Sequence, residues 1–399
     1  MKIGFWFSGM DGESGGGRTY EEELLNALYS VADLSLHSFL VFSSDDRSLP
    51  EQRPSHDRIF RVKVSHPTAV TSCIRLLYFS LNLPVFSFLY DRVAPLRRAL
   101  RKNPVDVMVF LSPIHDDVDI PSVTPVWDLQ HRLQPYFPEV SRNWLWDSRE
   151  KYYRKILPKS SIIVTGTRTG QDEISQLYNI PETNIRILPL PTPAFALSDQ
   201  PFTERTIHEK YAISGDYLLY PAQFWAHKNH VTLLLALKIL HEKHNLHLTA
   251  VLPGSDKGNQ SYIRKTVSEL NLLEYVRLPG FVPRQDLVLL YRQASALVFP
   301  TFFGPDNLPP LEAFALKCPV IASDIPGARE QLGDAAVLVD PRDAEKMAEA
   351  IRTVLTDPQF RAALIEKGYK RATSWTGLDY MKSLIAVLDD FGKVRRNWQ

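Results

Sequence analysis

The chain has 399 residues, of which 44% are hydrophobic and 23% charged, and this length and composition predict a globular protein of two domains. The formal net charge of +1 excludes a protein drawn to nucleic acid by its overall field, so any anion-binding site has to be local. Cys73 and Cys318 lie far apart and outside any Cys-x-x-Cys pair, so we expect no disulfide framework, no zinc site and a reducing, cytoplasmic compartment.

Continuous apolar runs separated by helical patterns fill most of the first half of the chain. The run Ile3–Phe7 is too short for the hydrophobic part of a signal peptide and predicts a strand. The further strand-like runs are Leu36–Phe42, Val105–Leu111, Ser161–Thr165 and Ile185–Leu188, and the helical patterns are Tyr20–Val31 and Asn143–Ile156. Because these runs are apolar throughout, they are typical of parallel strands covered on both faces.

A glycine-rich loop, Ser8–Arg18, follows the first predicted strand and leads into a helix. Glycines let backbone N–H groups approach a ligand closely, and a helix N-terminus favours an anion. The loop is neither a G-x-G-x-x-G fingerprint nor a Walker A loop, which disfavours nicotinamide and ATP sites. We expect Gly16 and Gly17 to lie beside a ligand; a flexible strand–helix turn is the alternative.

The tract from Thr71 to Asn103 interleaves aromatic and leucine side chains with basic ones. Such helices can lie on an anionic membrane surface, and they are equally typical of core-facing helices with a solvated basic end. The composition leaves both interpretations open. The longest apolar stretch, Cys73–Tyr90, contains Arg75 and Pro84, which disfavours a transmembrane helix.

Strands and helices alternate again in the second half of the chain. The strand-like runs are Tyr217–Tyr220, Leu246–Leu252, Ala296–Phe299, Val320–Ala322 and Val337–Val339, and the helical patterns are Val231–His244, Gln285–Ala294, Ala344–Leu355 and Gly377–Phe391. The proline-rich stretch Pro189–Thr203 predicts a linker. We therefore expect two doubly wound α/β domains, residues 1–198 and 199–376, with a C-terminal helix, 377–399, that packs back on the first domain.

Two loops of the second half carry residues suited to bind a phosphorylated ligand. Gln223 and Lys228 follow its first strand, and ligands of open α/β sheets bind at the carboxyl ends of strands. A second strand ends at Pro300, and a helix is expected to start near Pro310. The N–H groups of Asn307, Leu308 and Leu311 can then face an anion. Glu312, expected in the first turn, can accept ribose hydroxyls or complement the helix dipole, which is worth about 0.3–1 kcal/mol.

These pieces, in this order, resemble the family 4 glycosyltransferases of GT-B fold. The residues that carry the resemblance are His227-Lys228-Asn229, Gly280-Phe281-Val282, the block from Leu308 to Ala313, and the segments 314–323 and 325–330. The resemblance covers nearly the whole chain and is strongest over 217–340. It implies an α/β, GT-B architecture, with two Rossmann-like domains facing a central cleft. It also implies that Phe281 flanks the base of a donor held by the C-terminal domain.

In the N-terminal domain, Trp127-Asp128-Leu129-Gln130-His131-Arg132 resembles the family's His-Asp-Leu-Gln-His-Arg block. This similarity implies that Asp128 and His131 lie at the mouth of the cleft and are catalytic. Two positions depart from the family. Gly304 stands where the family has the first Glu of its Glu-rich block, which helps to hold the transferred sugar. Gln223 stands where many members carry an Arg for the diphosphate, so one phosphate cation is missing unless Arg18 or another basic side chain supplies it.

The resemblance implies retaining transfer of a sugar from a nucleotide-sugar donor to a glycan, with the acceptor on the N-terminal domain. Lys228 and the amides of Asn307 and Leu308 would stabilise the leaving diphosphate, without a protein nucleophile, metal or cofactor. A growing cell-surface glycan on a lipid carrier is the expected acceptor, with the protein at the cytoplasmic face of the membrane. A nucleotide-binding partner subunit without activity and a sugar-nucleotide epimerase are the alternatives.

Overall fold

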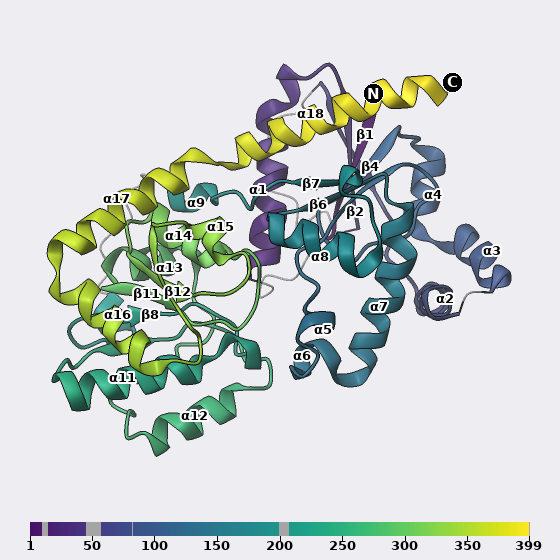
Figure 1. Ribbon diagram of the computed structural model, residues 1–399. Helices are drawn as coiled ribbons and strands as arrows, with labels where there is room; N and C mark the ends of the chain where they lie inside the picture. Colours follow the sequence, from purple (N-terminus) through teal and green to yellow (C-terminus); the bar gives the residue numbers. More distant parts are fainter. Residues whose placement is uncertain (10–14, 45–56, 82, 199–206, 399) are drawn as a thin grey trace. The chain divides into compact units, whose positions relative to one another are not determined.

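The computed structural model describes the whole chain except residues 10–14, 45–56, 82, 199–206 and 399 (Figure 1). The chain divides into two compact units, one made of Met1–Pro189 with Gly377–Gln399 and the other of Leu190–Thr376. The division falls where the proline-rich stretch begins, earlier than the expected boundary after residue 198. Part of the expected linker, 199–206, lies outside the described residues.

The first unit is built on a parallel sheet. Its strands in the described residues are β1 (Lys2–Phe7), β2 (Ser38–Ser43), β3 (Ile59–Lys63), β4 (Val107–Phe110), β5 (Ser122–Pro125), β6 (Ile162–Thr165) and β7 (Ile185–Ile187). They pair in the order β3-β2-β1-β4-β5-β6-β7, with Phe5 opposite Val41 and Val109. The central strands are buried on both faces, which explains why they are apolar throughout.

Helices cover both faces of this sheet (Figure 1). They are α1 (Gly16–Val31), α2 (Ala69–Ser80), α3 (Pro84–Val93), α4 (Pro95–Lys102), α5 (Gln130–Leu133), α6 (Pro138–Ser141), α7 (Leu145–Ile156), α8 (Arg168–Tyr178) and α18 (Gly377–Arg395), with short 3-10 turns at 32–34, 142–144, 157–159, 182–184 and 396–398. The C-terminal helix α18 packs on α1, where the hydroxyls of Tyr20 and Tyr380 lie 2.7 Å apart.

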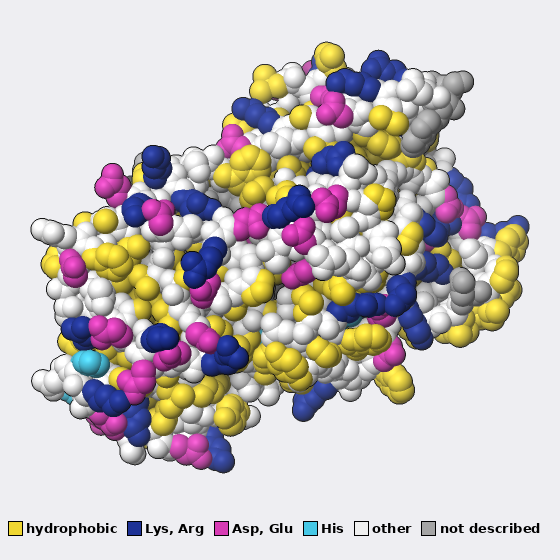
Figure 2. Space-filling view, in the orientation of Figure 1, with side chains coloured by type: hydrophobic (Ala, Val, Ile, Leu, Met, Phe, Trp, Pro, Cys, Tyr) yellow, Lys and Arg dark blue, Asp and Glu magenta, His cyan; other side chains and the backbone are white. Residues whose placement is uncertain are grey.

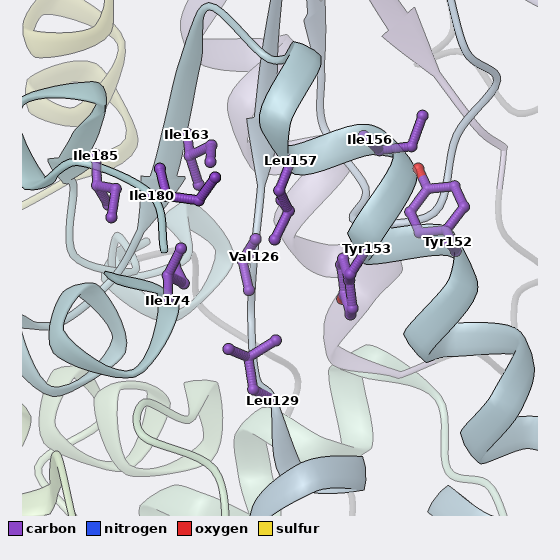
Figure 3. Close-up of a cluster of buried hydrophobic side chains, with 10 residues drawn as sticks. All are labelled: Val126, Leu129, Tyr152, Tyr153, Ile156, Leu157, Ile163, Ile174, Ile180 and Ile185. Carbon is purple, nitrogen blue, oxygen red and sulfur yellow. The ribbon is translucent and has the colours of Figure 1, made fainter. Parts of the chain in front are cut away.

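Part of the first unit's core lies between β6, β7, α7 and α8 (Figure 3). Ile163, Ile174 and Ile185 from β6, α8 and β7 point toward one another, and Tyr153 of α7 belongs to the same cluster. This packing fixes the position of α7, which carries Arg149 and Glu150, the partners of Asp128 and Arg132.

The second unit has its own parallel sheet. Its strands in the described residues are β8 (Tyr217–Leu219), β9 (Thr249–Val251), β10 (Val276–Arg277), β11 (Ala296–Phe299), β12 (Val320–Ser323) and β13 (Ala336–Val339), in the order β10-β9-β8-β11-β12-β13. Its helices are α9 (Ala194–Leu197), α10 (Ile207–Lys210), η5 (Ala226–Lys228), α11 (His230–His244), α12 (Gln260–Glu269), α13 (Arg284–Gln293), α14 (Leu308–Ala315), α15 (Ala328–Leu332), α16 (Ala344–Thr356) and α17 (Pro358–Ser374). Both units are therefore doubly wound α/β sheets.

Three strands, β3, β5 and β10, were not expected from the sequence. The edge strand β3 alternates in character, and only Ile59 is buried, so it lacks a continuous apolar run. The strand β5 ends in Pro125, and β10 has only two residues. Within the described part of the chain, none of the helices combines the length and the apolar character needed to cross a bilayer.

Candidate active site

The candidate donor site lies at the carboxyl edge of the second unit's sheet, where several loops pack closely. The N–H of Gly254, after β9, donates to the carbonyl of Gly280, after β10, at 2.9 Å. A Cβ on Gly254 would overlap the carbonyl oxygen of Ala222, after β8, and one on Gly327 would overlap that of Pro305. These glycines let backbone segments touch, so the loops form one continuous surface.

Asn229 fixes the loop that carries Lys228. Its φ of 53° lies in the left-handed region, which Asn tolerates better than most residues. Its side-chain amide donates to the carbonyls of Pro300 at 2.9 Å and Pro341 at 2.7 Å, so it joins the loops after β8, β11 and β13. The hydroxyl of Tyr220 donates to the carbonyl of Lys228 at 2.7 Å. The backbone of Lys228 is therefore held on both sides.

The side chain of Lys228 is half-buried, with Nζ 5.3 Å from the centre of the Phe299 ring. The neighbouring His230 is fully buried and stacks on Phe224 at 4.5 Å. Burial and then the charge of Lys228 lower the pKa of His230 to about 3, so this imidazole is neutral. Gln223 accepts a hydrogen bond from the indole of Trp225 at 3.0 Å. Lys228 is thus the cationic member of this loop.

The N-terminus of α14 offers fewer donors than expected. The helix begins at Leu308, two positions before the expected Pro310. The N–H of Asn307 donates to the side-chain oxygen of Gln331 at 2.9 Å, and the Gln331 amide donates back to the Asn307 carbonyl at 2.8 Å. Pro309 and Pro310 have no N–H. Among the described residues, Leu308 is therefore the first-turn residue whose N–H has no partner, and an anion contact from the Asn307 amide, which would replace its bond to Gln331, stays a prediction.

Glu312 lies in the second turn of α14 rather than the first, so complementing the helix dipole is a weak explanation for it. Its side chain is buried and accepts a hydrogen bond from the hydroxyl of Tyr291 at 2.8 Å. Burial raises the pKa of Glu312 to about 7, against smaller lowering effects of Tyr291 and of the charge of Arg284. A buried carboxyl with this pKa can become an acceptor for hydroxyl groups when a ligand covers it.

Gly304 is built into the turn before α14. Its φ of 113° is one that residues with a Cβ rarely adopt. An added Cβ would lie 2.8 Å from the side-chain nitrogen of Asn307, which itself donates to the Gly304 carbonyl at 3.0 Å. The position that corresponds to the family's first Glu is therefore shaped for a residue without a side chain. The nearest acidic residue in the sequence, Asp306, lies two positions after Gly304.

The remaining predicted donor residues lie in separate places. Phe281 follows Gly280, whose φ is 75°, and its ring is 56% exposed, so a flat apolar face is accessible beside the β10 loop. Gly16 and Gly17 open α1 in the first unit, after Gly15 with a φ of 64°. Much of their loop, 10–14, lies outside the described residues, so their contact with a donor stays a prediction.

In the first unit, Asp128 lies at the carboxyl edge of the sheet and is paired. It accepts hydrogen bonds from Arg149 at 3.0 Å and from the N–H of Gln130 at 3.0 Å. Burial opposes ionisation, but the charge of Arg149 and the hydrogen bonds from Gln130 and Arg149 together outweigh it and lower the pKa of Asp128. Asp128 is therefore a fixed carboxylate, held by a side chain of α7.

His131 is fully buried, and its ring has no exposed surface. Its Nε2 lies 3.2 Å from the hydroxyl of Tyr178 and 3.4 Å from Glu150. Burial and then the charge of Arg149 lower the pKa of His131 to about 4, so the imidazole is neutral. This geometry gives His131 a supporting place beneath the edge, and its catalytic role stays a prediction.

Two carboxyl groups of the first unit were missed. Glu21 is fully buried on α1 beside Ser8, and burial raises its pKa to about 7. The sequence held a signal for it, since Glu21 falls three residues before buried Leu24, on the apolar face. Burial, and then the charge of Asp128, raise the pKa of Glu173 to about 7. The pKa of Asp128 is lowered and that of Glu173 is raised, and two interacting carboxyl groups with pKa values shifted in opposite directions are typical of functional sites.

Comparisons with known proteins find similarity to glycosyltransferases. Residues 203–371 match the family described as "Glycosyl transferases group 1". O-antigen chain mannosyltransferase B of Escherichia coli is 24% identical over 327 residues, which span 80% of this chain and 84% of that protein. O-antigen chain mannosyltransferase RfbU of Salmonella typhimurium is 27% identical over 233 residues, which span 56% of this chain and 59% of that protein.

The fold is also that of solved glycosyltransferases. The structure of HepE from Anabaena in complex with UDP and glucose is similar to this chain, with a TM-score of 0.70 and 16% identity, covering 98% of this chain and 100% of that one. At this identity the likeness shows the fold alone, and the parallel sheets of the two units fit the GT-B fold. Over residues 203–371 the chain therefore resembles the group 1 glycosyltransferases, and its fold is similar to that of HepE.

Proposed function

We propose that this glycosyltransferase moves a hexose from a nucleotide-sugar donor to a growing cell-surface glycan on a lipid carrier, with retention of configuration. The observation that carries the proposal is that Lys228 follows β8, and Leu308 and buried Glu312 follow the neighbouring strand β11, at the carboxyl edge of one parallel sheet. The mannosyltransferase names of the two O-antigen relatives make mannose the first sugar to test.

In this proposal the three groups have separate tasks. Lys228 and the Leu308 N–H meet the donor diphosphate, where negative charge grows as the sugar leaves. Preorganised donors at such a position are worth about 10²–10³ in rate each. Glu312 accepts the ribose hydroxyls, and the exposed ring of Phe281 packs on the base. The leaving phosphate takes the acceptor proton, so the reaction needs neither a protein nucleophile nor a metal.

The acceptor side of the proposal rests on the first unit. Asp128, fixed by Arg149, is a carboxylate that can accept hydrogen bonds from sugar hydroxyls at the carboxyl edge of that sheet. The proposed acceptor is lipid-linked, so we place the protein at the cytoplasmic face of a membrane.

The turn at Gly304 supports one competing function, a nucleotide-binding subunit without activity. The positive φ of that turn disfavours the family's first Glu, which helps to hold the transferred sugar, and a Cβ there would displace the side chain of Asn307. The two functions differ in turnover. Donor hydrolysis or transfer by the purified chain excludes the inactive subunit, whereas donor binding without either reaction supports it.

The first experiment is a thermal-shift panel of nucleotide sugars on the full-length chain. A ligand that binds the native state stabilises it by RT ln(1 + [L]/Kd), so the donor gives the largest shift. Lys228→Ala should abolish the shift, and Lys238→Ala, on the following helix, should leave it unchanged. A panel without any shift, or equal shifts in both variants, would overturn the assignment of the site.

A further inference from the structure

An apolar surface is exposed on α2 and α3 in the first unit. Its members are large apolar side chains with between 43% and 63% of their surface exposed: Leu76, Leu81, Leu83, Val85 and Phe88. Figure 2 shows yellow side chains along the right-hand edge of the molecule, where Figure 1 places α2 and α3, with dark blue side chains beside them. We call these five residues the α2–α3 surface.

The helices α2 and α3 also have a packed inner face. Tyr78 of α2 and Tyr90 of α3 are buried and stack at 4.3 Å. Phe79 packs edge-on against Tyr78, and Nζ of Lys155 donates to the Tyr78 carbonyl at 2.6 Å. The inner face of the helix pair is thus packed and anchored to α7. The α2–α3 surface is a second apolar face, turned outward.

Positive charge accompanies this surface. Residues 69–102 include six basic residues and one acidic residue, Asp91, whereas the whole chain has 46 basic and 45 acidic residues. The guanidinium of Arg92 lies 4.2 Å from the centre of the Phe88 ring. Asp91 is bound by Arg97 at 3.1 Å and by Arg101 at 3.4 Å, so its charge is offset. Arg75 and Arg97 are paired with Asp116 and Asp119, so the exposed positive charge of this segment rests mainly on Arg92, Arg98 and Lys102.

The spacing on α3 puts the two properties on one face. Val85, Phe88 and Arg92 follow one another at i, i+3 and i+7, so they share one side of the helix. Arg98 and Lys102, exposed on α4, follow at i and i+4. Apolar side chains on a face rimmed by basic groups are suited to the boundary between lipid headgroups and acyl chains. These basic side chains favour a partner that carries negative charge over a purely apolar one.

We propose that the α2–α3 surface docks on a bilayer that contains anionic lipids. The apolar side chains enter the headgroup boundary, and Arg92, Arg98 and Lys102 meet the lipid phosphates. Docking goes beyond glycosyl transfer and is tested without an acceptor, so vesicle binding can fail while donor binding persists, and the reverse.

Vesicle flotation of the full-length chain tests the proposal. We expect binding to phosphatidylcholine vesicles with 30% phosphatidylglycerol and weak binding to pure phosphatidylcholine, with the difference lost at high salt. Each basic residue near an anionic surface contributes about fivefold in affinity. Replacing Arg92, Arg98 and Lys102 with Gln should therefore lower binding about 100-fold.

The apolar contribution needs a matched control. The double variant Leu83→Asp/Phe88→Asp should lose vesicle binding and keep its donor-induced thermal shift. The control is Tyr262→Asp/Leu273→Asp, which changes residues 55% and 66% exposed in the second unit, and it should bind vesicles like wild type. Equal binding by both variants, or no binding of wild type to anionic vesicles, would overturn the proposal.

The chain supplies its own reporter for orientation. Cys73 is exposed on α2, whereas Cys318 is buried, so a thiol-reactive environment-sensitive dye should label Cys73 selectively. Its emission should shift to the blue on anionic vesicles. Unchanged emission from vesicle-bound protein would refute docking through this surface. A concentration-dependent dimer that is lost in Leu83→Asp/Phe88→Asp would assign the surface to self-association instead.

Discussion

Replacing Glu312 with Gln gives the sharpest test of how the donor site works, beginning with the protein alone. Burial raises the pKa of this carboxyl from 4.5 to about 7. Between these values the folded protein keeps a proton that the unfolded chain has released, so the free energy of unfolding falls as pH rises. The shift corresponds to about 3 kcal/mol. Glu312→Gln removes this dependence, so the variant should gain stability relative to wild type between pH 5 and pH 8.

The same change predicts an effect on the donor. If the anionic form of Glu312 accepts the ribose hydroxyls, donor affinity of the wild type rises with pH up to about 7 and is constant above it. Hydrogen bonds to a charged group contribute about 1.5–3 kcal/mol, so Glu312→Gln should weaken binding by about 10–100-fold at pH 8. The variant's affinity should also be independent of pH.

Isothermal titration calorimetry from pH 5.5 to 8.5 measures both effects on the donor, the loss of affinity and its pH dependence. A nucleotide sugar is the proper ligand, because its diphosphate diester does not titrate in this range, unlike the terminal phosphate of a free nucleotide. The control is Glu366→Gln, which changes an exposed carboxylate on α17. If wild type and Glu312→Gln show the same pH profile and affinity, the assignment of Glu312 to the ribose is refuted.

Three further changes test the rest of the site. Lys228→Ala should lower kcat about 10²–10³-fold in a transfer assay, with an unchanged melting temperature in the absence of ligand; a drop equal to that of Lys238→Ala would argue against its role. Gly304→Glu should not raise activity, and its positive φ and contact with Asn307 should cost about 1–3 kcal/mol in chemical denaturation; a more active variant would contradict the geometry of this turn. Asn229→Ala removes three buried hydrogen bonds and should cost about 2–4 kcal/mol by the same measurement, with a weaker donor-induced thermal shift; a neutral substitution would show that the loop is held by other contacts.

Much of the fold was predictable because the central strands are buried on both faces. The runs Ile3–Phe7 and Ala296–Phe299 predicted β1 and β11 almost to the residue, and these predictions are confirmed. The edge strand β3 and the short β10 were missed, because partial exposure and a length of two residues leave no apolar run. The periodicity of a sequence records burial, so elements at the rim of a sheet leave a weak signal.

The site was predictable as far as local rules reach. The carboxyl-edge rule placed Lys228 and the turn before α14 on the same side of one sheet. Contacts between distant segments were beyond these rules. The pairing of the Asn307 N–H with Gln331, 24 residues further along the chain, and the complete burial of the His131 ring both depend on such contacts. The positive φ of Gly304 shows that its departure from the family is part of the local backbone.

The central claim is that this chain transfers a sugar from a nucleotide donor with retention, using the edge that carries Lys228. The most direct measurement is a proton NMR time course of the full-length chain with the donor found by thermal shift and a lipid-linked glycan acceptor. The account predicts a new glycosidic linkage with the anomeric configuration of the donor, and no product with Lys228→Ala. An inverted linkage, or equal product from Lys228→Ala, would contradict it.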